Sequence, residues 1–321
     1  MELTVTRDVF RLAQTFTIAR GSRTEAQVLT VTIRDGDHVG QGECVPYARY
    51  GESLDSVTAQ IEALALPLDR AKLQEVLAPG AARNAVDCAL WDLEAKKAGK
   101  PAWTLAGLDA LGPVTTAYSL SLESPEQMQA DAAKAAHRPL LKVKLGTPDD
   151  IARLEAVRAG APDPAIVVDA NEGWTAEIYA ELVPHLQRLG VTMVEQPLPA
   201  AEDDALRDIP RPVPVCADES FHDRASLAGL SGKYDMVNIK LDKTGGLTEA
   251  LAARREAEAA GYGIMIGCMV GSSLAMAPAI LLAQGAKVVD LDGPLLLAED
   301  RPTALTYEGS VMHPANPGLW G

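Results

Sequence analysis

The chain has 321 residues, 47% of them hydrophobic, which is enough for one large domain or two ordinary ones. Its formal net charge of −15 and pI near 4.8 argue against a nucleic-acid partner, because such partners require a basic surface. The start, MELTVTRDVF, has no signal core and no apolar stretch is long enough to cross a bilayer, so no membrane partner is expected. The four widely spaced cysteines are expected to be free thiols of a cytoplasmic protein.

The first part of the chain predicts a separate α+β domain. Two β-rich runs surround RDGDHVG in the stretch EAQVLTVTIRDGDHVGQGECV, 25–45, a pattern typical of a β-hairpin. Helical patterns follow over 53–66 and 81–99, and the second is expected to end at Gly99, two residues before a proline. We assign residues 1–112 to this domain.

From residue 113 onward the chain repeats one pattern, in which a short β-rich run is followed by a helix-like segment rich in Ala, Leu and Glu. The eight runs are 114–122, 140–145, 165–171, 191–197, 213–220, 236–243, 263–269 and 287–293. Strands alternating with helices at this spacing predict a parallel β/α barrel over residues 113–295. The period is lost after Pro294, so we expect residues 296–321 to leave the barrel and pack against the first domain.

Two other folds fit this pattern less well. A doubly wound open sheet usually carries a glycine-rich phosphate loop after an early strand, and this sequence has none. A solenoid would require repeated sequence, whereas these units share an architecture but little sequence.

Ionisable or polar side chains stand near the ends of most β-rich runs, where a parallel barrel places its catalytic groups. They are Lys142, Lys144, Asp169, Asn171, Glu195, Asp218, Lys240, Asp290 and Asp292. Any one of them could be a solvated loop residue, but nearly every run ends in this way after several apolar residues. Together they predict one polar site at the barrel mouth.

Asp169, Glu195 and Asp218 come from three neighbouring strands, and three converging carboxylates repel one another unless a cation joins them. No Cys or His accompanies them at ligand spacing, and His222 is expected in the following loop. An all-oxygen site favours a hard ion, so we expect one Mg²⁺ per subunit.

Lys144 and Lys240 belong to the second and sixth predicted strands, so they should face each other across the mouth. A substrate carboxylate held on the metal would then have an amine on each face of its α-carbon. That arrangement suits the removal of a proton from one side and its return on the other. Lys142 is expected to tune Lys144 as a like charge on the same strand face. A salt-bridged, solvated edge strand is the plainer alternative.

These residues resemble the enolase superfamily and, within it, the muconate lactonizing enzyme subgroup. The motifs KVK, VDAN, VEQP, ADES and NIKLDKTGG occur in order, and the resemblance covers the whole chain. It implies a (β/α)7β modified TIM barrel with an N-terminal α+β capping domain. It also implies Lys144 and Lys240 as catalytic bases and Mg²⁺ held by Asp169, Glu195 and Asp218.

Finer features are similar to the dipeptide epimerases, especially those that act on L-Ala-D/L-Glu. In that family, the motif DLDG on the last run implies that Asp290 and Asp292 hold the free amino group of a dipeptide. The motif ARGSR, in a capping loop, implies an arginine that pairs with an acidic substrate side chain; we expect Arg23, with Arg20 second. The resemblance implies further substrate contacts from Ser119, Lys142, Cys268 and Val270, with Asn171 behind them.

The leading interpretation is a cytoplasmic isomerase that epimerises a dipeptide by 1,1-proton transfer at the α-carbon of its C-terminal residue. The expected pair is L-Ala-D-Glu and L-Ala-L-Glu, as in recycling of peptidoglycan peptides, and a homo-oligomer is compatible with the sequence. The main alternative is another reaction of the subgroup, such as that of o-succinylbenzoate synthase or a cycloisomerase, which the acidic last strand disfavours. A non-catalytic binding barrel would not need two opposed lysines, and a Schiff-base aldolase would need only one.

Overall fold

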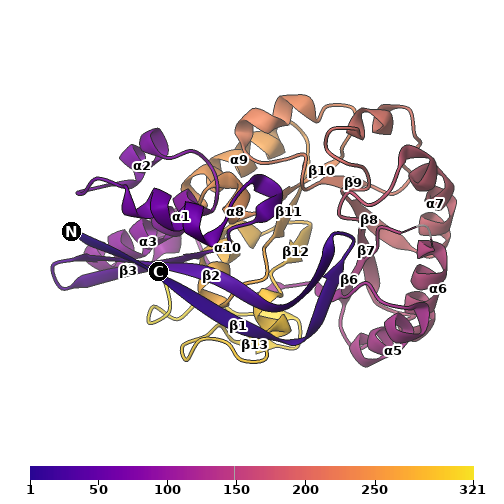
Figure 1. Ribbon diagram of the computed structural model, residues 1–321, viewed down its shortest axis with the longest axis horizontal. Helices are drawn as coiled ribbons and strands as arrows, with labels where there is room; N and C mark the ends of the chain where they lie inside the picture. The colour runs from indigo at the N-terminus through magenta and orange to yellow at the C-terminus, as the bar shows by residue number, and fades with distance from the viewer. Residues whose placement is uncertain (148) are drawn as a thin grey trace.

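The computed structural model describes residues 1–147 and 149–321. It confirms the predicted fold, because eight parallel strands form a nearly closed barrel beside an antiparallel N-terminal domain (Figure 1). The capping domain lies at the left of Figure 1, and its long β1–β2 hairpin reaches across the front of the barrel. In the described residues, no helix combines the length and the apolar character that crossing a membrane requires.

The capping domain is a three-stranded antiparallel sheet with helices packed against it. Its elements are β1 (Glu2–Ile18), β2 (Gly21–Asp35), β3 (His38–Cys44), η1 (Ala48–Tyr50), α1 (Leu54–Glu62), α2 (Arg70–Val76), α3 (Ala81–Ala98) and α4 (Ala102–Leu105). As predicted, α3 ends at Gly99, whose φ of 60° is one that glycine adopts without penalty. Helix α3 lies directly on β3, where a Cβ at Gly40 would approach the Ala89 carbonyl oxygen to 2.1 Å.

Strand β1 was not predicted. Its residues alternate between half-buried and exposed positions, so its apolar periodicity is weak in the sequence. It pairs with β2 from Glu2 opposite Arg34 to Ile18 opposite Gly21. The turn between the two strands carries Arg20 towards the barrel.

The barrel sheet has the strand order β5 to β12, with every neighbouring pair parallel. Its strands are β5 (Tyr118–Leu120), β6 (Leu140–Lys144), β7 (Ala165–Asp169), β8 (Val191–Glu195), β9 (Val215–Ala217), β10 (Met236–Ile239), β11 (Gly263–Gly267) and β12 (Val288–Asp290). The first and last strands meet where the Ala117 N–H donates to the Val289 carbonyl oxygen at 2.8 Å. The carboxyl ends of all eight strands therefore surround one opening.

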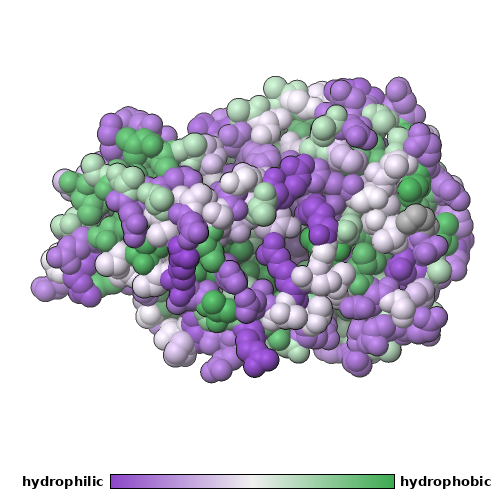
Figure 2. Space-filling model, viewed as in Figure 1, coloured by the Kyte–Doolittle hydropathy of each residue, from purple (hydrophilic) through white to green (hydrophobic). Residues whose placement is uncertain are grey.

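Helices cover the outside of this sheet, and their outer faces are mostly hydrophilic over α5 to α7 (Figure 2). They are α5 (Pro125–Ala135), α6 (Asp150–Gly160), α7 (Ala176–Arg188), α9 (Leu247–Ala259) and α10 (Ser273–Ala283), whereas the short α8 (Leu241–Thr244) follows β10 at the barrel mouth and contacts α3. The connections after β8 and β9 are instead the 3₁₀ helices η2 (Asp203–Arg207) and η3 (Arg224–Gly229).

The predicted strand 114–122 divides in two. Its first part, β4 (Val114–Thr115), pairs with β14 (Val311–Met312), which in turn pairs with β13 (Tyr307–Glu308). The chain also forms η4 (Gly293–Leu296) after the last barrel strand. The final residue then donates its N–H to Asp92 Oδ1 at 2.8 Å, so the end of the chain contacts the capping domain.

Candidate active site

The side chains inside the barrel change from apolar to charged towards the carboxyl ends of the strands. An apolar cluster that includes Val167, Met193 and Cys216 packs on the face of the sheet away from the helices. Side chains two positions apart share a strand face, so the residues two positions further along also point inward. These residues are the predicted carboxylates Asp169, Glu195 and Asp218, all of them buried.

Lys142 and Lys144 are buried, with exposures of only 1% and 8%, and β6 has a neighbour on each side. A solvated edge strand is therefore excluded. Lys142 Nζ lies 2.7 Å from Glu195 Oε2, 2.7 Å from Asp290 Oδ2 and 3.1 Å from Asp169 Oδ2. Lys142 thus cross-links three carboxylates, and its predicted action on Lys144 as a neighbouring like charge stays a prediction.

Lys144 and Lys240 each pair with one barrel carboxylate. Lys144 Nζ donates to Asp169 Oδ2 at 2.6 Å, and Lys240 Nζ donates to Asp218 Oδ2 at 2.7 Å. Strands β6 and β10 are four places apart in the sheet, so the two lysines enter the mouth from opposite sides. Lys240 lies directly after β10 rather than within it, at the start of α8.

Lys243 is a further buried lysine, and the sequence analysis missed it. Its Nζ donates to Asp218 Oδ1 at 2.6 Å and to the backbone carbonyls of Asp218 and Asn238 at 2.5 and 3.0 Å. Asp218 therefore has an ammonium group on each carboxylate oxygen. The available signal was the three-residue spacing of Lys240 and Lys243 at a helix start, which places both on one face.

Close packing of these charges shifts their pKa values in opposite directions. Burial alone would raise the pKa of Asp218, but the ammonium groups of Lys240 and Lys243 hold it well below its usual range. Burial and the neighbouring Asp169 raise the pKa of Glu195. Burial and Asp218 raise the pKa of Glu219 to about 7. Negative charge is therefore only partly compensated on the Glu195 and Glu219 side of the site.

Asp290 and Asp292 form a buried acidic pair beside this cluster. Asp290 Oδ2 accepts a hydrogen bond from Lys142, whereas its Oδ1 has no hydrogen-bond partner in the described part of the chain. Asp292 Oδ2 accepts from the backbone N–H of Ser119 at 2.7 Å. Burial and Asp290 raise the pKa of Asp292 to about 7. The pair can therefore accept a further donor.

A cavity of about 190 Å³ opens between the capping loops and the barrel mouth. The predicted site residues that line it are Arg23, Lys144, Asn171, Asp218, Lys240, Cys268 and Val270. The other predicted residues, Ser119, Lys142, Asp169, Glu195, Asp290 and Asp292, do not line it, and all are buried. The structure thus gathers the predicted residues into one region, with the two opposed lysines on the cavity wall.

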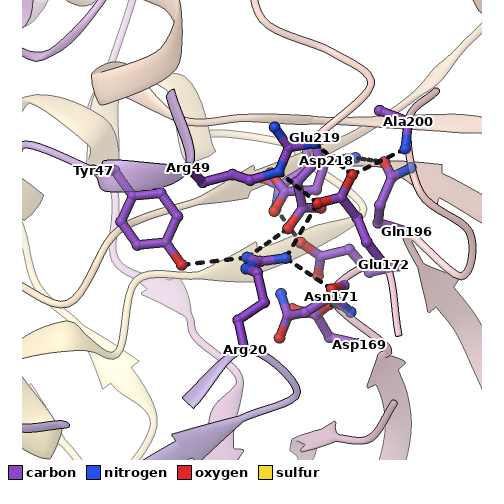
Figure 3. A network of polar contacts seen from close by, with 12 residues as sticks. Arg20, Tyr47, Arg49, Asp169, Asn171, Glu172, Gln196, Ala200, Asp218 and Glu219 are labelled. Carbon is purple, nitrogen blue, oxygen red and sulfur yellow. Dashed lines mark hydrogen bonds and ion pairs between the residues drawn. The ribbon is translucent and has the colours of Figure 1, made fainter. Parts of the chain in front are cut away.

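The two arginines of the capping loop have different surroundings, and those of Arg20 are drawn in Figure 3. Arg20 NH2 lies 2.8 Å from Glu219 Oε1, and Arg20 NH1 donates to the Asn171 carbonyl oxygen at 2.7 Å. Arg23 is exposed and lines the cavity, with its guanidinium carbon 5.1 Å from the centre of the Tyr47 ring. Both arginines line the cavity, but Arg20 is paired with groups of the barrel, whereas Arg23 has no ion pair among the described residues.

Glu172 is a second residue that the sequence analysis missed, and it joins both capping loops to the barrel (Figure 3). It accepts two hydrogen bonds from Arg49, each of 2.7 Å, and lies 3.4 Å from Arg20 NH1. Its φ is +68°, and the preceding Asn171 has a φ of +46°, conformations that are uncommon for residues with a side chain. The acidic residue in NEGW, directly after the VDAN motif, was the available signal.

The chemistry of the carboxylates suits a hard cation, although in this structure their oxygen atoms are not arranged as a complete coordination site. In residues 1–147 and 149–321, no three Asp, Glu, His or Cys side chains are arranged to hold a metal as they stand, because lysine ammonium groups lie between the carboxylates. The donors are all oxygen atoms, and Glu195 Oε2 makes no hydrogen bond with any described residue although Lys142 Nζ lies 2.7 Å away. A divalent cation would compete with these ammonium groups for the same oxygens. His222 packs against the Tyr50 ring instead.

Two families of known domains match the chain. Residues 1–107 match the N-terminal domain of the mandelate racemase/muconate lactonizing enzyme family, and residues 126–319 match the enolase C-terminal domain-like family. The L-Ala-D/L-Glu epimerase of Escherichia coli K12 is 46% identical over 96% of this chain and 98% of its own length. The N-acetyl-D-glutamate racemase of Pseudoalteromonas sp. is also 46% identical, over 92% of this chain and 95% of its own length.

Solved structures agree with these matches. An enolase family member from Agrobacterium tumefaciens, with homology to dipeptide epimerases and with bound sodium and L-Ala-L-Glu, has a TM-score of 0.98 and 56% identity, covering 99% of both chains. The dipeptide epimerase of Enterococcus faecalis V583, complexed with Mg and L-Leu-L-Tyr, has a TM-score of 0.91 and 28% identity, covering 100% of this chain and 99% of its own. The chain therefore belongs to the enolase superfamily, to its mandelate racemase/muconate lactonizing enzyme family and, within it, to the dipeptide epimerases, which makes it an isomerase.

Proposed function

We propose that this protein interconverts L-Ala-D-Glu and L-Ala-L-Glu by moving the α-proton of the glutamate residue from one face to the other. The observation that carries the proposal is the placement of Lys144 and Lys240 on opposite sides of one cavity, beside three buried carboxylates. One lysine would remove the α-proton of each epimer and the other would return a proton to the opposite face. We assign Lys144 to one epimer and Lys240 to the other.

Asp169, Glu195 and Asp218 would hold one Mg²⁺ in this proposal. A bound divalent cation supplies positive charge beside a substrate carboxylate, which makes the α-proton more acidic. Support comes from the all-oxygen donor set and from the likeness to the Enterococcus faecalis enzyme. Lys142 would keep Asp169, Glu195 and Asp290 close together, because it contacts all three.

The ends of the substrate would meet opposite charges. Asp290 has a buried Oδ1 without a hydrogen-bond partner among the described residues, which suits the N-terminal ammonium group of a dipeptide. Arg23, which lines the cavity, suits the side-chain carboxylate of glutamate. Ser119, Cys268 and Val270 are assigned to substrate contacts between these ends.

The same proposal includes the setting of the enzyme. We assign residues 1–112 to the capping domain, 113–295 to the barrel and 296–321 to the returning segment. We place the enzyme in the cytoplasm, where it would act on Ala-Glu released from peptidoglycan during recycling. Assembly into a homo-oligomer is compatible with this role.

A second candidate is racemisation of an N-acylated glutamate, because the Pseudoalteromonas relative is as similar as the Escherichia coli one. Arg23 would serve either substrate. The acidic pair Asp290 and Asp292 favours the dipeptide, since an N-acyl group carries no positive charge to balance them. The same pair argues against the o-succinylbenzoate synthase or cycloisomerase alternative.

The test is proton exchange in D₂O with Mg²⁺ present, followed by mass spectrometry and chiral separation of the dipeptides. The wild type should put deuterium on the glutamate α-carbon and interconvert both epimers. Lys144→Ala and Lys240→Ala should each lower epimerisation at least about 100-fold, yet each should still exchange the α-proton of one epimer. If either variant epimerises at close to the wild-type rate, the two-base assignment is wrong.

A further inference from the structure

We infer that Tyr47 is a positioning residue for substrate specificity, because its ring holds the Arg23 guanidinium at the cavity wall and is itself held by Arg20. The inference rests on the proposed function, in which Arg23 receives the acidic side chain of the dipeptide. It adds a reason why that arginine, rather than Arg20, selects the substrate.

Arg20 is the fixed point of this arrangement (Figure 3). Its guanidinium contacts Glu219 at 2.8 Å and donates to the Asn171 carbonyl oxygen at 2.7 Å, and its side chain is only 27% exposed. Glu219 is itself buried, so this ion pair is shielded from solvent. The positive charge of Arg20 is therefore neutralised within the protein, and contacts with the barrel fix the position of its guanidinium group.

Tyr47 connects Arg20 to Arg23. Arg20 NH2 donates to the Tyr47 hydroxyl oxygen at 3.2 Å, which orients the ring (Figure 3). The backbone N–H of Tyr47 donates to Glu52 Oε2 at 3.1 Å, which fixes the other end of the residue. Tyr47 is half-buried and lines the same cavity as Arg23.

Arg23 needs such support because no other side chain among the described residues fixes it. Across residues 1–147 and 149–321, its side chain makes no ion pair or hydrogen bond, and it is exposed. A free arginine samples many rotamers, and fixing them costs free energy when a ligand binds. Stacking of the guanidinium carbon 5.1 Å from the Tyr47 ring centre restricts those rotamers while leaving the N–H edge free for a carboxylate.

The experiment compares L-Ala-L-Glu with L-Ala-L-Gln, which has nearly the same shape but no side-chain charge. Selectivity is the ratio of kcat/KM for the two dipeptides. Tyr47→Leu should lower it about tenfold, equivalent to about 1.4 kcal/mol. Tyr47→Phe keeps the ring and should lower it by no more than about threefold. In an Arg23→Ala background, Tyr47→Leu should cause no further loss of selectivity.

Arg138→Ala is the matched control, because Arg138 stacks on Tyr118 at 4.0 Å and neither residue lines the cavity. Its selectivity should equal that of the wild type. The inference is overturned if Tyr47→Leu slows both dipeptides equally, or if it lowers selectivity as much without Arg23 as with it. A wild-type enzyme that exchanges neither dipeptide would overturn the proposed function and this inference together, whereas the first two results leave the proposed function intact.

Discussion

Removal of the substrate ammonium group should reveal whether Asp290 and Asp292 recognise it. Propanoyl-L-Glu is L-Ala-L-Glu without its amino group, so it changes the charge while leaving the protein and its Lys142–Asp290 pair untouched. Asp290 Oδ1 is buried and accepts no hydrogen bond from the residues that the structure describes, and the analogue would give it no donor either. Loss of one buried, charge-assisted contact costs roughly 2–5 kcal/mol, so kcat/KM should fall at least about 30-fold.

The assay measures deuterium incorporation at the glutamate α-carbon in D₂O for L-Ala-L-Glu, propanoyl-L-Glu and N-acetyl-L-Glu at matched concentrations. Because all three keep the reacting carbon and the acidic side chain, they differ only around the amino group. The two N-acyl compounds should both be poor substrates. An increase in KM that exceeds the decrease in kcat would indicate that the contact is made before the transition state.

Equal kcat/KM values for L-Ala-L-Glu and propanoyl-L-Glu would refute the assignment of the acidic pair to an ammonium group. Faster exchange with N-acetyl-L-Glu would go further, because it would favour the racemase candidate over the dipeptide epimerase. In that event the buried charge at Asp290 would need only its Lys142 partner.

Three other outcomes are expected. Chelation of divalent metal should abolish α-proton exchange without changing the far-UV circular dichroism, and full activity in metal-free protein would contradict the metal assignment. Glu172→Gln should raise KM about threefold or more, because each capping loop loses an ion pair, one through Arg49 and one through Arg20. The control Asp55→Asn removes an exposed ion pair with Arg7 and should not change KM. Burial raises the pKa of Asp242 to about 7, so the folded wild type loses stability as the pH rises from 3.8, the pKa of the unfolded state, to about 7. Asp242→Asn should therefore remove roughly 2 kcal/mol of the difference between the unfolding free energies at about pH 5 and about pH 8. If urea titrations give the same difference for the variant and the wild type, this reasoning is wrong.

The barrel was predictable because its strands combine two strong signals, an apolar run and a charged residue where the run ends. Lys144, Asp169 and Glu195 each close such a run, and the structure aligns them across neighbouring strands. Strand β1 gave no such signal, because only one of its faces is partly covered. The 3₁₀ connections were also missed, because alanine and leucine content does not distinguish a short 3₁₀ helix from an α-helix.

The site was predictable in its composition but not in its pairing. Residue spacing indicates which side chains point inward, yet it does not show which cation meets which anion. The three carboxylate partners of Lys142 were therefore not predicted, and Lys243 was given no role. Contacts between the capping loops and the barrel, such as that of Arg20 with Glu219, join positions about 200 residues apart, a separation over which local periodicity carries no information.

The positive φ of Glu172 implies a conflict between selection for stability and selection for activity at one position. Glycine adopts such a backbone at no steric cost, so Glu172→Gly would relieve strain of about 1 kcal/mol or more. The same change would release Arg49 and loosen the closure of the cavity. A laboratory evolution experiment that rewards heat resistance alone should therefore accept substitutions here that one rewarding turnover would reject.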